Sequence, residues 1–133
     1  MRQFNLEIVT PDGEAFSGQA ESIIVKTTLG DVEILYGHTD YFAALSTGIA
    51  KIKSNSKVRL ASLSGGFISV KSGSVKVVAT TFEFSDEIDK KRAERAKERA
   101  EALLSAAKDE KESKIAKAKL ARALTRIEAS GAK

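Results

Sequence analysis

The feature that most constrains this chain is an abrupt change of composition near residue 85. All eight aromatic residues, eight of the nine glycines and the single proline, Pro11, lie in residues 1–84. Residues 85–133 consist largely of Ala, Lys, Arg, Glu and Leu, with no aromatic residue. Such a break marks a boundary between two structural classes. We therefore expect one unit over residues 1–84 and a second over residues 85–133.

The first unit has the pattern of an antiparallel β-structure. Apolar and polar residues alternate over residues 4–8, and similar short runs follow at residues 23–25, 32–34, 50–52, 58–60, 68–70 and 75–77. Turn-forming residues separate these runs, among them Pro11-Asp12-Gly13, and the pair Gly65-Gly66 predicts a bulge or a tight bend. Many short strands with frequent turns indicate a β-sandwich or a barrel.

The second unit has the pattern of two helices, each of roughly 15–20 residues, joined as an antiparallel hairpin. Small apolar residues form one stripe before the polar run at residues 108–114 and another stripe after it. The two stripes are Ala93, Ala96, Ala100, Leu103 and Ala107, then Ala116, Leu120, Ala123, Leu124 and Ile127. Ser85 is the expected N-cap of the first helix, and Asp109 with Glu112 is the expected capping pair of the second. Gly131 is the expected terminator.

The first of these stripes consists mostly of alanine. Alanine lets two helices approach closely, but it buries few methylene groups, each worth about 0.8 kcal/mol. We therefore expect stable helices whose tertiary attachment is weak, so that the hairpin opens or moves relative to the β-unit. A hairpin permanently docked on the β-unit is an equally open interpretation, because a sequence does not report the energy gap between the two states.

The composition excludes several classes of functional site. The 133 residues include no cysteine, which removes disulfides, zinc–thiolate sites, Fe–S clusters and cysteine nucleophiles. The single histidine, His38, excludes a multi-histidine metal site, and we expect it to be a turn residue without chemistry. No stretch approaches the roughly 18 apolar residues of a membrane span, and the N-terminus alternates like a strand rather than a signal peptide. We expect a soluble, cytosolic protein with no catalytic residue and no metal site.

Four arginines of the second unit have a spacing that predicts an anion site. Arg92 and Arg99 are seven residues apart and share one face of the first helix, while Arg122 and Arg126 are four apart and share one face of the second. In an antiparallel hairpin the start of the first helix lies beside the end of the second, so the four guanidinium groups converge. Uncompensated arginines repel one another, and their planar forks suit phosphate.

Three residues at the entrance of the first helix extend this prediction to a nucleotide. Glu83 and Asp89 are placed to read the polar edge of a base, and Ile88 is placed to pack against its face. No Walker loop, candidate base or metal cage accompanies them, so a nucleoside polyphosphate would be sensed rather than hydrolysed. The alternative is a solvated charged face with i,i+4 ion pairs, and spacing alone leaves both interpretations open.

Two other function classes have less support from the residues. A nucleic-acid-binding arm would have more than the net charge of +4, and it would have aromatic residues for stacking on bases, which the second unit lacks. A stand-alone nucleotide enzyme would need a phosphate loop, a metal cluster or more than one histidine. We expect neither nucleic acid as a partner nor turnover of the nucleotide.

Three segments carry a resemblance to a known family over nearly the whole chain. They are FNLEIVTPDGEAFSGQAESIIVKTTLGDVEILYGHTDYFAAL, SLSGGFISVKSGSVKVVA and EIDKKRAERAKERAEALL. The chain resembles the epsilon subunit of bacterial F-type ATP synthases, which implies a ten-stranded N-terminal antiparallel β-sandwich followed by two antiparallel helices. The Gly37-His38 turn departs from the family, in which proline commonly precedes the glycine and Ala-Pro follows the histidine. Here Tyr36 precedes and Thr39-Asp40 follows, so the resemblance does not fix this loop or a contact made by it.

The resemblance implies a rotor subunit that couples hydrogen ion transport to ATP synthesis. The sandwich would bind the gamma subunit and rest on the c-ring, and the chain would be peripheral on the cytoplasmic face of the bacterial cell membrane without inserting into it. The hairpin would be compact in one state. In another it would extend along gamma into the alpha/beta catalytic hexamer and inhibit ATP hydrolysis. The alternative is a coupling and assembly subunit with a weak, non-regulatory ATP site.

The resemblance also implies ATP as a regulatory ligand and no catalytic cofactor. In several members ATP binds between the helices at the pattern Ile-Asp-x-x-Arg-Ala, which is complete here at residues 88–93. The implied site residues are Glu83, Ile88, Asp89, Arg92, Ala93, Arg99, Arg122 and Arg126. We expect ATP to neutralise the arginines and hold the hairpin shut. Without ATP, basic residues that include Lys114, Lys117 and Lys119 would meet acidic surfaces of the beta subunits.

Overall fold

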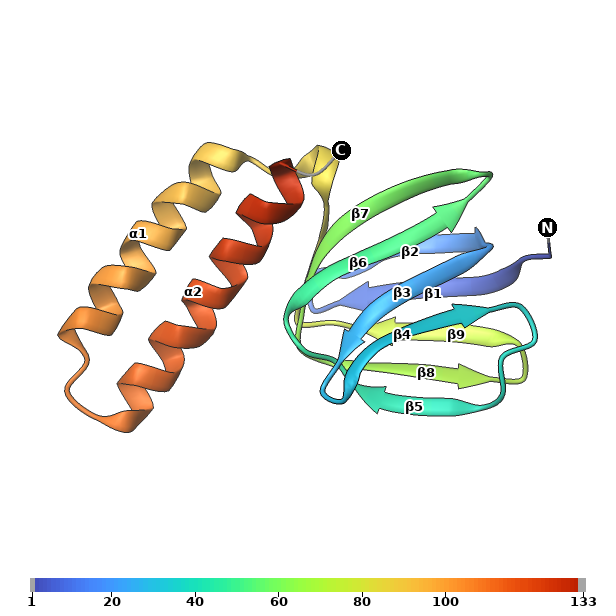
Figure 1. Ribbon diagram of the computed structural model, residues 1–133, viewed down its shortest axis with the longest axis horizontal. Helices are drawn as coiled ribbons and strands as arrows, with labels where there is room; N and C mark the ends of the chain where they lie inside the picture. The colour runs from blue at the N-terminus through green and yellow to red at the C-terminus, as the bar shows by residue number, and fades with distance from the viewer. Residues whose placement is uncertain (1, 132–133) are drawn as a thin grey trace.

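A computed structural model describes residues 2–131, in which a ten-stranded β-sandwich is followed by a hairpin of two helices (Figure 1). The predicted fold class is confirmed. The strands are β1 (Phe4–Thr10), β2 (Gly13–Ala20), β3 (Ser22–Thr27), β4 (Gly30–Leu35), β5 (Tyr41–Ala44), β6 (Gly48–Ser54), β7 (Lys57–Ser64), β8 (Phe67–Lys71), β9 (Ser74–Val78) and β10 (Thr81–Phe84). They are followed by a 3₁₀ helix η1 (Ser85–Glu87), then α1 (Lys90–Ala106) and α2 (Glu110–Gly131).

The strands form two five-stranded sheets. One sheet has the order β2-β1-β9-β8-β5 and the other the order β10-β7-β6-β3-β4. Every pair of neighbouring strands is antiparallel except β1 and β9, which run parallel with Leu6 opposite Val75. This parallel pair is part of the otherwise antiparallel sandwich that the sequence predicts. Parallel neighbours need a long crossover connection, and here strands β2 to β8 supply it.

The core lies between the two sheets and is mainly aliphatic, with Phe4 and Phe84 also buried in it. Phe4, Leu6 and Ile8 are buried in alternation along β1, as the sequence predicts. The other strands add branched residues that meet them from both sheets. The largest fully buried side chains are Leu6, Ile8, Ile23, Ile34, Ile52, Ile68, Val25 and Val77. This dense aliphatic layer makes the sandwich a rigid base for the helices.

The glycine pair between β7 and β8 forms the predicted tight bend. Gly65 and Gly66 have φ values of +63° and +96°, a backbone region that favours glycine. A Cβ on Gly66 would lie 1.7 Å from the carbonyl oxygen of Val78. The bend therefore requires glycine both for its conformation and for the close approach of another backbone segment.

His38 lies in the loop after β4. Its backbone N–H donates to the carbonyl of Leu35 at 3.2 Å, and its Nδ1 lies 2.7 Å from the carbonyl oxygen of Thr39. Asp40 Oδ1 accepts from the N–H of Ser72 at 3.1 Å and ties the loop to the β8–β9 turn. The loop that departs from the family pattern is thus held by its own polar contacts.

The first helix begins later than the sequence indicates. Asp89, not Ser85, is the N-cap of α1, and its Oδ1 accepts from the N–H of Arg92 at 3.1 Å. Ser85 instead opens η1, because Ile88 is extended with φ −78° and ψ 126° and interrupts the helical run. The predicted capping pair of α2 is confirmed. Asp109 Oδ1 accepts from the N–H of Glu112, and Glu112 Oε2 accepts from the N–H of Lys108, both at 2.8 Å.

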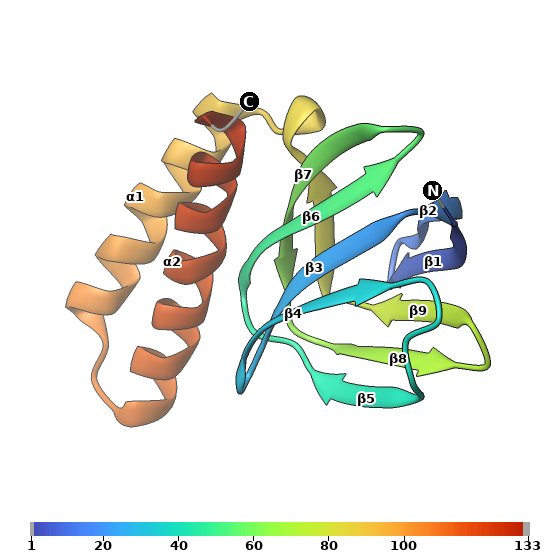
Figure 2. The same cartoon turned by 45° about the vertical axis from the view of Figure 1, so that its right-hand side comes forward.

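Helix α2 lies between α1 and the sandwich, against β6, β7 and η1 (Figures 1 and 2). The helices have 17 and 22 residues, so α2 is somewhat longer than predicted. Their buried residues are Ala93 and Ala100 in α1, with Ala116, Ala123, Thr125 and Ala129 in α2. Leu103 and Leu124, expected in the stripes, are 49% and 44% exposed. Fewer residues of the two predicted stripes are therefore buried than the sequence indicates. Within residues 2–131, neither helix is both long and apolar enough to cross a membrane.

Candidate functional site

A cleft of about 440 Å³ lies where the hairpin meets the sandwich, a volume within the range of small-molecule sites. Its sandwich wall consists of Thr10, Asp12, Ser62, Thr80, Thr81, Phe82 and Glu83. The opposite wall consists of Glu87 and Asp89 before α1, of Arg92, Ala93, Ala96 and Arg99 in α1, and of Arg126 in α2. Three parts of the fold therefore form one cavity, which we call the junction cleft.

Two neighbouring cavities continue the junction cleft with different chemistry. A cleft of about 270 Å³ between the helices shares Ala96, Arg99 and Arg126 with it and adds Ala100, Leu103, Lys119 and Arg122. A groove of about 350 Å³ shares Thr10, Asp12, Phe82, Glu83 and Glu87 with it and adds Gly13, Glu14, Ala15 and Phe84. The interhelical cleft has basic residues and no carboxylate, and the groove has carboxylates and no basic residue. The site is therefore electrically polarised along its length.

Most of the residues predicted for a nucleotide site line these cavities. Glu83, Asp89, Arg92, Ala93, Arg99 and Arg126 line the junction cleft, and Arg122 lines the interhelical cleft. Ile88 lies between η1 and α1 and lines neither cavity. The sequence therefore identified most of the helical wall but placed Ile88 closer to the cavity than the structure does.

The expectation that all four arginines lack a partner is wrong for Arg126. Its Nε lies 3.6 Å from Glu83 Oε1, and the side chains of this pair are 31% and 40% exposed. The guanidinium groups of Arg92, Arg99 and Arg122 have no carboxylate within ion-pair distance in residues 2–131. Three positive charges at the cleft thus have no acidic partner, and an anion entering it would meet them directly.

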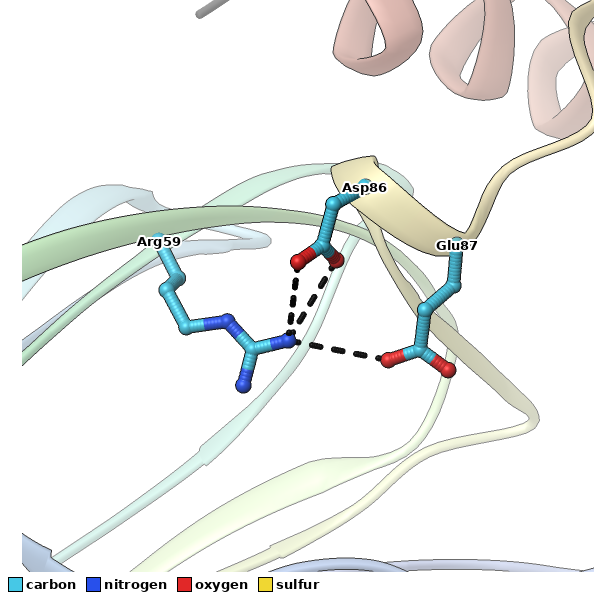
Figure 3. A network of polar contacts seen from close by, with 3 residues as sticks. All are labelled: Arg59, Asp86 and Glu87. Carbon is cyan, nitrogen blue, oxygen red and sulfur yellow. Dashed lines mark hydrogen bonds and ion pairs between the residues drawn. The ribbon is translucent and has the colours of Figure 1, made fainter.

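The segment between the sandwich and α1 is held by a contact network around Arg59 of β7 (Figure 3). Arg59 Nη2 lies 3.3 Å from Asp86 Oδ1 and 3.6 Å from Glu87 Oε1. The guanidinium carbon lies 3.6 Å from the centroid of the Phe84 ring, a cation–π geometry. Arg59 therefore ties η1 to β7 and engages Glu87 at the rim of the junction cleft.

The sandwich wall of the junction cleft was not predicted from the sequence. Thr10 ends β1, and Asp12 lies in the turn that follows, whose residues indicated only turn formation. Thr80 lies just before β10 and Thr81 begins it, and nothing in their sequence indicated that they face α1. No sequence signal for these positions exists without the fold. In the described part of the chain, no cluster of three or more His, Asp or Glu side chains is arranged to hold a metal ion.

Comparison with known proteins assigns both units to one family. Residues 3–85 match the family described as ATP synthase, Delta/Epsilon chain, beta-sandwich domain, and residues 86–131 match its long alpha-helix domain. The chain belongs to the ATP synthase epsilon chain family. The ATP synthase epsilon chain of Ruminococcus albus is 42% identical over 134 residues and is covered fully, as is this chain. That of Halalkalibacterium halodurans is 38% identical, with 98% of this chain and 99% of the relative covered. The predicted resemblance to the bacterial F-type epsilon subunit is confirmed.

Solved structures agree with this assignment of the epsilon chain. A chain of the Euglena gracilis mitochondrial ATP synthase, in a structure of its OSCP, F1 and c-ring parts, has a TM-score of 0.80 and 25% identity. The match covers 98% of this chain and 82% of that one. A chain of the Tetrahymena thermophila mitochondrial ATP synthase central stalk and c-ring has a TM-score of 0.68 at 17% identity, a likeness of fold.

Proposed function

We propose that this epsilon chain is a non-catalytic rotor subunit whose helical hairpin responds to ATP. The sandwich binds the gamma subunit and rests on the c-ring, so the chain takes part in coupling hydrogen ion transport to ATP synthesis. The complex holds it on the cytoplasmic face of the bacterial cell membrane, as a peripheral protein. The family assignment supports this placement, as do the solved relatives, which are chains of assemblies that include a c-ring.

The junction cleft with its arginines carries the proposal of an ATP site. Arg92 and Arg99 from α1, Arg122 from α2 and the half-buried Arg126 surround the two connected cavities. Guanidinium groups form charge-assisted, bidentate hydrogen bonds with phosphate oxygens. Three of the four have no acidic partner in residues 2–131, and a triphosphate supplies the missing negative charge.

ATP in this position stabilises the compact hairpin by mass action. A ligand that binds only the compact state adds about 2.7 kcal/mol when its concentration is a hundred times its dissociation constant. The seam between the helices buries mainly alanine, so an increment of this size is large relative to its own packing. Because the junction cleft includes sandwich residues, the ligand holds α1 to the sandwich as well as to α2.

Without ATP, the hairpin extends along gamma into the alpha/beta hexamer and inhibits ATP hydrolysis. Lys114, Lys117 and Lys119 are exposed on α2 and are available to acidic surfaces of the beta subunits. Arg122 and Arg126 then bind either the nucleotide, in the compact state, or the hexamer, in the extended state. Two ligands that favour different conformations of one element make that element a switch.

Calorimetric titration of ATP into the purified chain tests the site. Arg92→Ala and Arg126→Ala should each weaken ATP binding at least about tenfold, because each removes charge-assisted hydrogen bonds. Arg95→Ala is the matched control, since Arg95 is an exposed arginine of α1 that lines neither cleft. Its affinity should stay within about twofold of the wild type. Equal affinities for all three variants and the wild type would refute the site.

Distance measurements test the regulatory part of the proposal. The chain has no cysteine, so spin labels can be placed at will. Arg95→Cys with Glu128→Cys reports on the two helices, and Ser74→Cys with Lys108→Cys reports on the sandwich and the hairpin. ATP should narrow both distance distributions toward the compact state. If ATP binds and neither distribution changes, the chain is a coupling and assembly subunit with a non-regulatory site.

A further inference from the structure

We propose that Asp12, in the turn between β1 and β2, is a specificity-determining residue that accepts hydrogen bonds from the ribose hydroxyls of the bound nucleotide. This inference rests on the proposed function, because it needs a nucleoside polyphosphate in the junction cleft. It assigns the nucleoside part of the ligand to the sandwich, whereas the sequence motif assigns the site to residues at the hairpin.

The polarity of the site fixes the direction in which such a ligand lies. The interhelical cleft has Arg99, Lys119, Arg122 and Arg126 and no carboxylate, so it takes the phosphates. The groove at the other end is lined by carboxylates that repel phosphate. The nucleoside therefore lies toward the β1–β2 turn. Its hydroxyl groups are hydrogen-bond donors, and carboxylates are the acceptors that suit them.

Three of the four carboxylates that line the junction cleft already have partners. Glu83 lies 3.6 Å from Arg126, and Glu87 lies 3.6 Å from Arg59. Asp89 accepts from the N–H of Arg92 as the cap of α1. Asp12 also lines the cleft, but its carboxylate makes no hydrogen bond and no ion pair within residues 2–131. Asp12 is the carboxylate that is free to accept from a ligand.

The backbone of the turn holds Asp12 in place. Its N–H donates to Thr10 Oγ1 at 3.2 Å, and Thr10 Oγ1 donates to the carbonyl of Gly13 at 3.3 Å. Gly13 has φ +122°, which closes the turn into β2. A carboxylate on a rigid turn is a good acceptor for a pair of adjacent hydroxyls, and proteins use Asp or Glu for the ribose 2′-hydroxyl elsewhere.

This assignment adds a physical link to the proposed regulation. Phosphates on the helical arginines and a ribose on Asp12 place one ligand across the boundary between the two units. A nucleotide bound in this way opposes any movement of α1 away from the sandwich. A nucleotide without ribose hydroxyls would keep the phosphate contacts and lose this one.

Titrations of ATP, 2′-deoxyATP and 3′-deoxyATP into the full chain test the assignment. The wild type should prefer ATP over at least one deoxy analogue by about tenfold, the contribution of a hydrogen bond to a charged acceptor. Asp12→Ala should remove this preference and bind all three nucleotides alike. Asp12→Asn keeps the size of the side chain and should retain a reduced preference. The measured quantity is the ratio of affinities, because removing a negative charge alone strengthens phosphate binding to every analogue.

Glu14→Gln is the matched control. Glu14 is the second residue of β2, two residues after Asp12, and it lines the acidic groove but not the junction cleft, so its loss changes the net charge equally. The control should keep the wild-type preference for ATP. Two results would overturn the role of Asp12 alone. In the first, Asp12→Ala keeps the preference for ATP over the deoxy analogues. In the second, the wild type has no such preference although Arg92→Ala still weakens ATP binding. A wild-type chain that binds no ATP overturns the proposed function and this inference together.

Discussion

The sandwich and the hairpin bury different kinds of side chain. The largest fully buried side chains of the sandwich core are eight isoleucines, leucines and valines. The residues that α1 and α2 bury, against each other and against the sandwich, are five alanines and Thr125. Full burial of a branched aliphatic side chain contributes about 1.5–3 kcal/mol, several times what one alanine methyl contributes. The comparison indicates that the sandwich is tightly packed, whereas the hairpin that it carries has little packing energy of its own.

The composition break also supplies separate probes for the two units. All aromatic residues lie in residues 1–84, and both helices longer than one turn lie after them. Tyrosine fluorescence, from Tyr36 and Tyr41, therefore follows the sandwich. The helical signal in far-ultraviolet circular dichroism follows the hairpin. The effect of a substitution can therefore be assigned to the sandwich or to the hairpin in the intact chain.

The largest effect is expected from a cavity in the sandwich core. Ile68 is 0% exposed, so Ile68→Ala should lower the free energy of unfolding by about 2–5 kcal/mol through lost burial and an unfilled void. Urea titration followed by tyrosine fluorescence measures it. Ile68→Val is the graded control, with an expected loss of about 0.5–1.5 kcal/mol. A loss for Ile68→Ala no larger than that of the valine variant would contradict the interpretation that the sandwich is tightly packed.

An overpacked seam should have the next largest effect, and only on the hairpin. Ala100 is 1% exposed, and Ala100→Leu should destabilise the closed hairpin by about 1–3 kcal/mol because the closely packed helices must separate. Spin labels at Arg95→Cys and Glu128→Cys should report a larger helix separation, while the tyrosine transition stays unchanged. Ala102→Leu, on an exposed position of the same helix, should leave the separation unchanged. A shift of the tyrosine transition by Ala100→Leu would show that the two units are not energetically separate.

The sequence predicts the central strands better than the edges of the sheets. The short apolar runs indicate β1, β3, β4, β6, β7, β8 and β9, of which only β4 lies at an edge of a sheet. The strands that no such run indicated, β2, β5 and β10, each lie at an edge of a sheet. In β2 only Ala20 is buried, so its residues have little apolar pattern to show. An edge strand is specified by pairing with its neighbour, and such pairing is not visible in one sequence.

The residues of the candidate site also divide into those that the sequence predicts and those that it does not. The arginines of the helices were predictable, because helical spacing fixes which residues share a face and a hairpin fixes which ends meet. The pairing of Arg126 with Glu83 was not, since it joins α2 to β10 across the unit boundary. The same holds for Asp12 and Thr10, which reach the cleft only because the β1–β2 turn comes to lie beside α1. Contacts within one element follow from periodicity, and contacts between units require the docking geometry.

A smaller effect is expected from the cap at the far end of the hairpin. Asp109→Ala removes the acceptor of the Glu112 N–H and should cost α2 about 1 kcal/mol. Hydrogen exchange in the first turn of α2 should become faster, and Asp109→Asn should largely preserve its protection. Asp109 lines neither the junction cleft nor the interhelical cleft, so ATP affinity should change by less than about twofold. Unchanged hydrogen exchange in the alanine variant would show that the cap does not stabilise α2.

The smallest effect on stability is expected at the connection between the two units. The side chains of Arg59 and its partners Asp86 and Glu87 are 43%, 68% and 63% exposed, and exposed ion pairs contribute about 0.2–1 kcal/mol. Arg59→Ala should therefore leave the tyrosine and helical transitions nearly unchanged, and it should accelerate hydrogen exchange in η1. Salt should accelerate that exchange in the wild type toward the rate of the variant, because the pairs are screened.

Arg59→Lys separates the charge from the stacking at this connection. Lysine keeps the positive charge but lacks the planar group that lies 3.6 Å from the Phe84 ring centroid, so it should restore only part of the protection. Lys57→Ala, on the same strand and exposed, is the control for a lost charge. If hydrogen exchange in η1 is the same in Arg59→Ala and in the wild type at low salt, the contacts around Arg59 do not stabilise the segment between the sandwich and α1. Weak, solvent-exposed contacts would suit the release of the hairpin that the proposed function requires, because they break without disturbing either core.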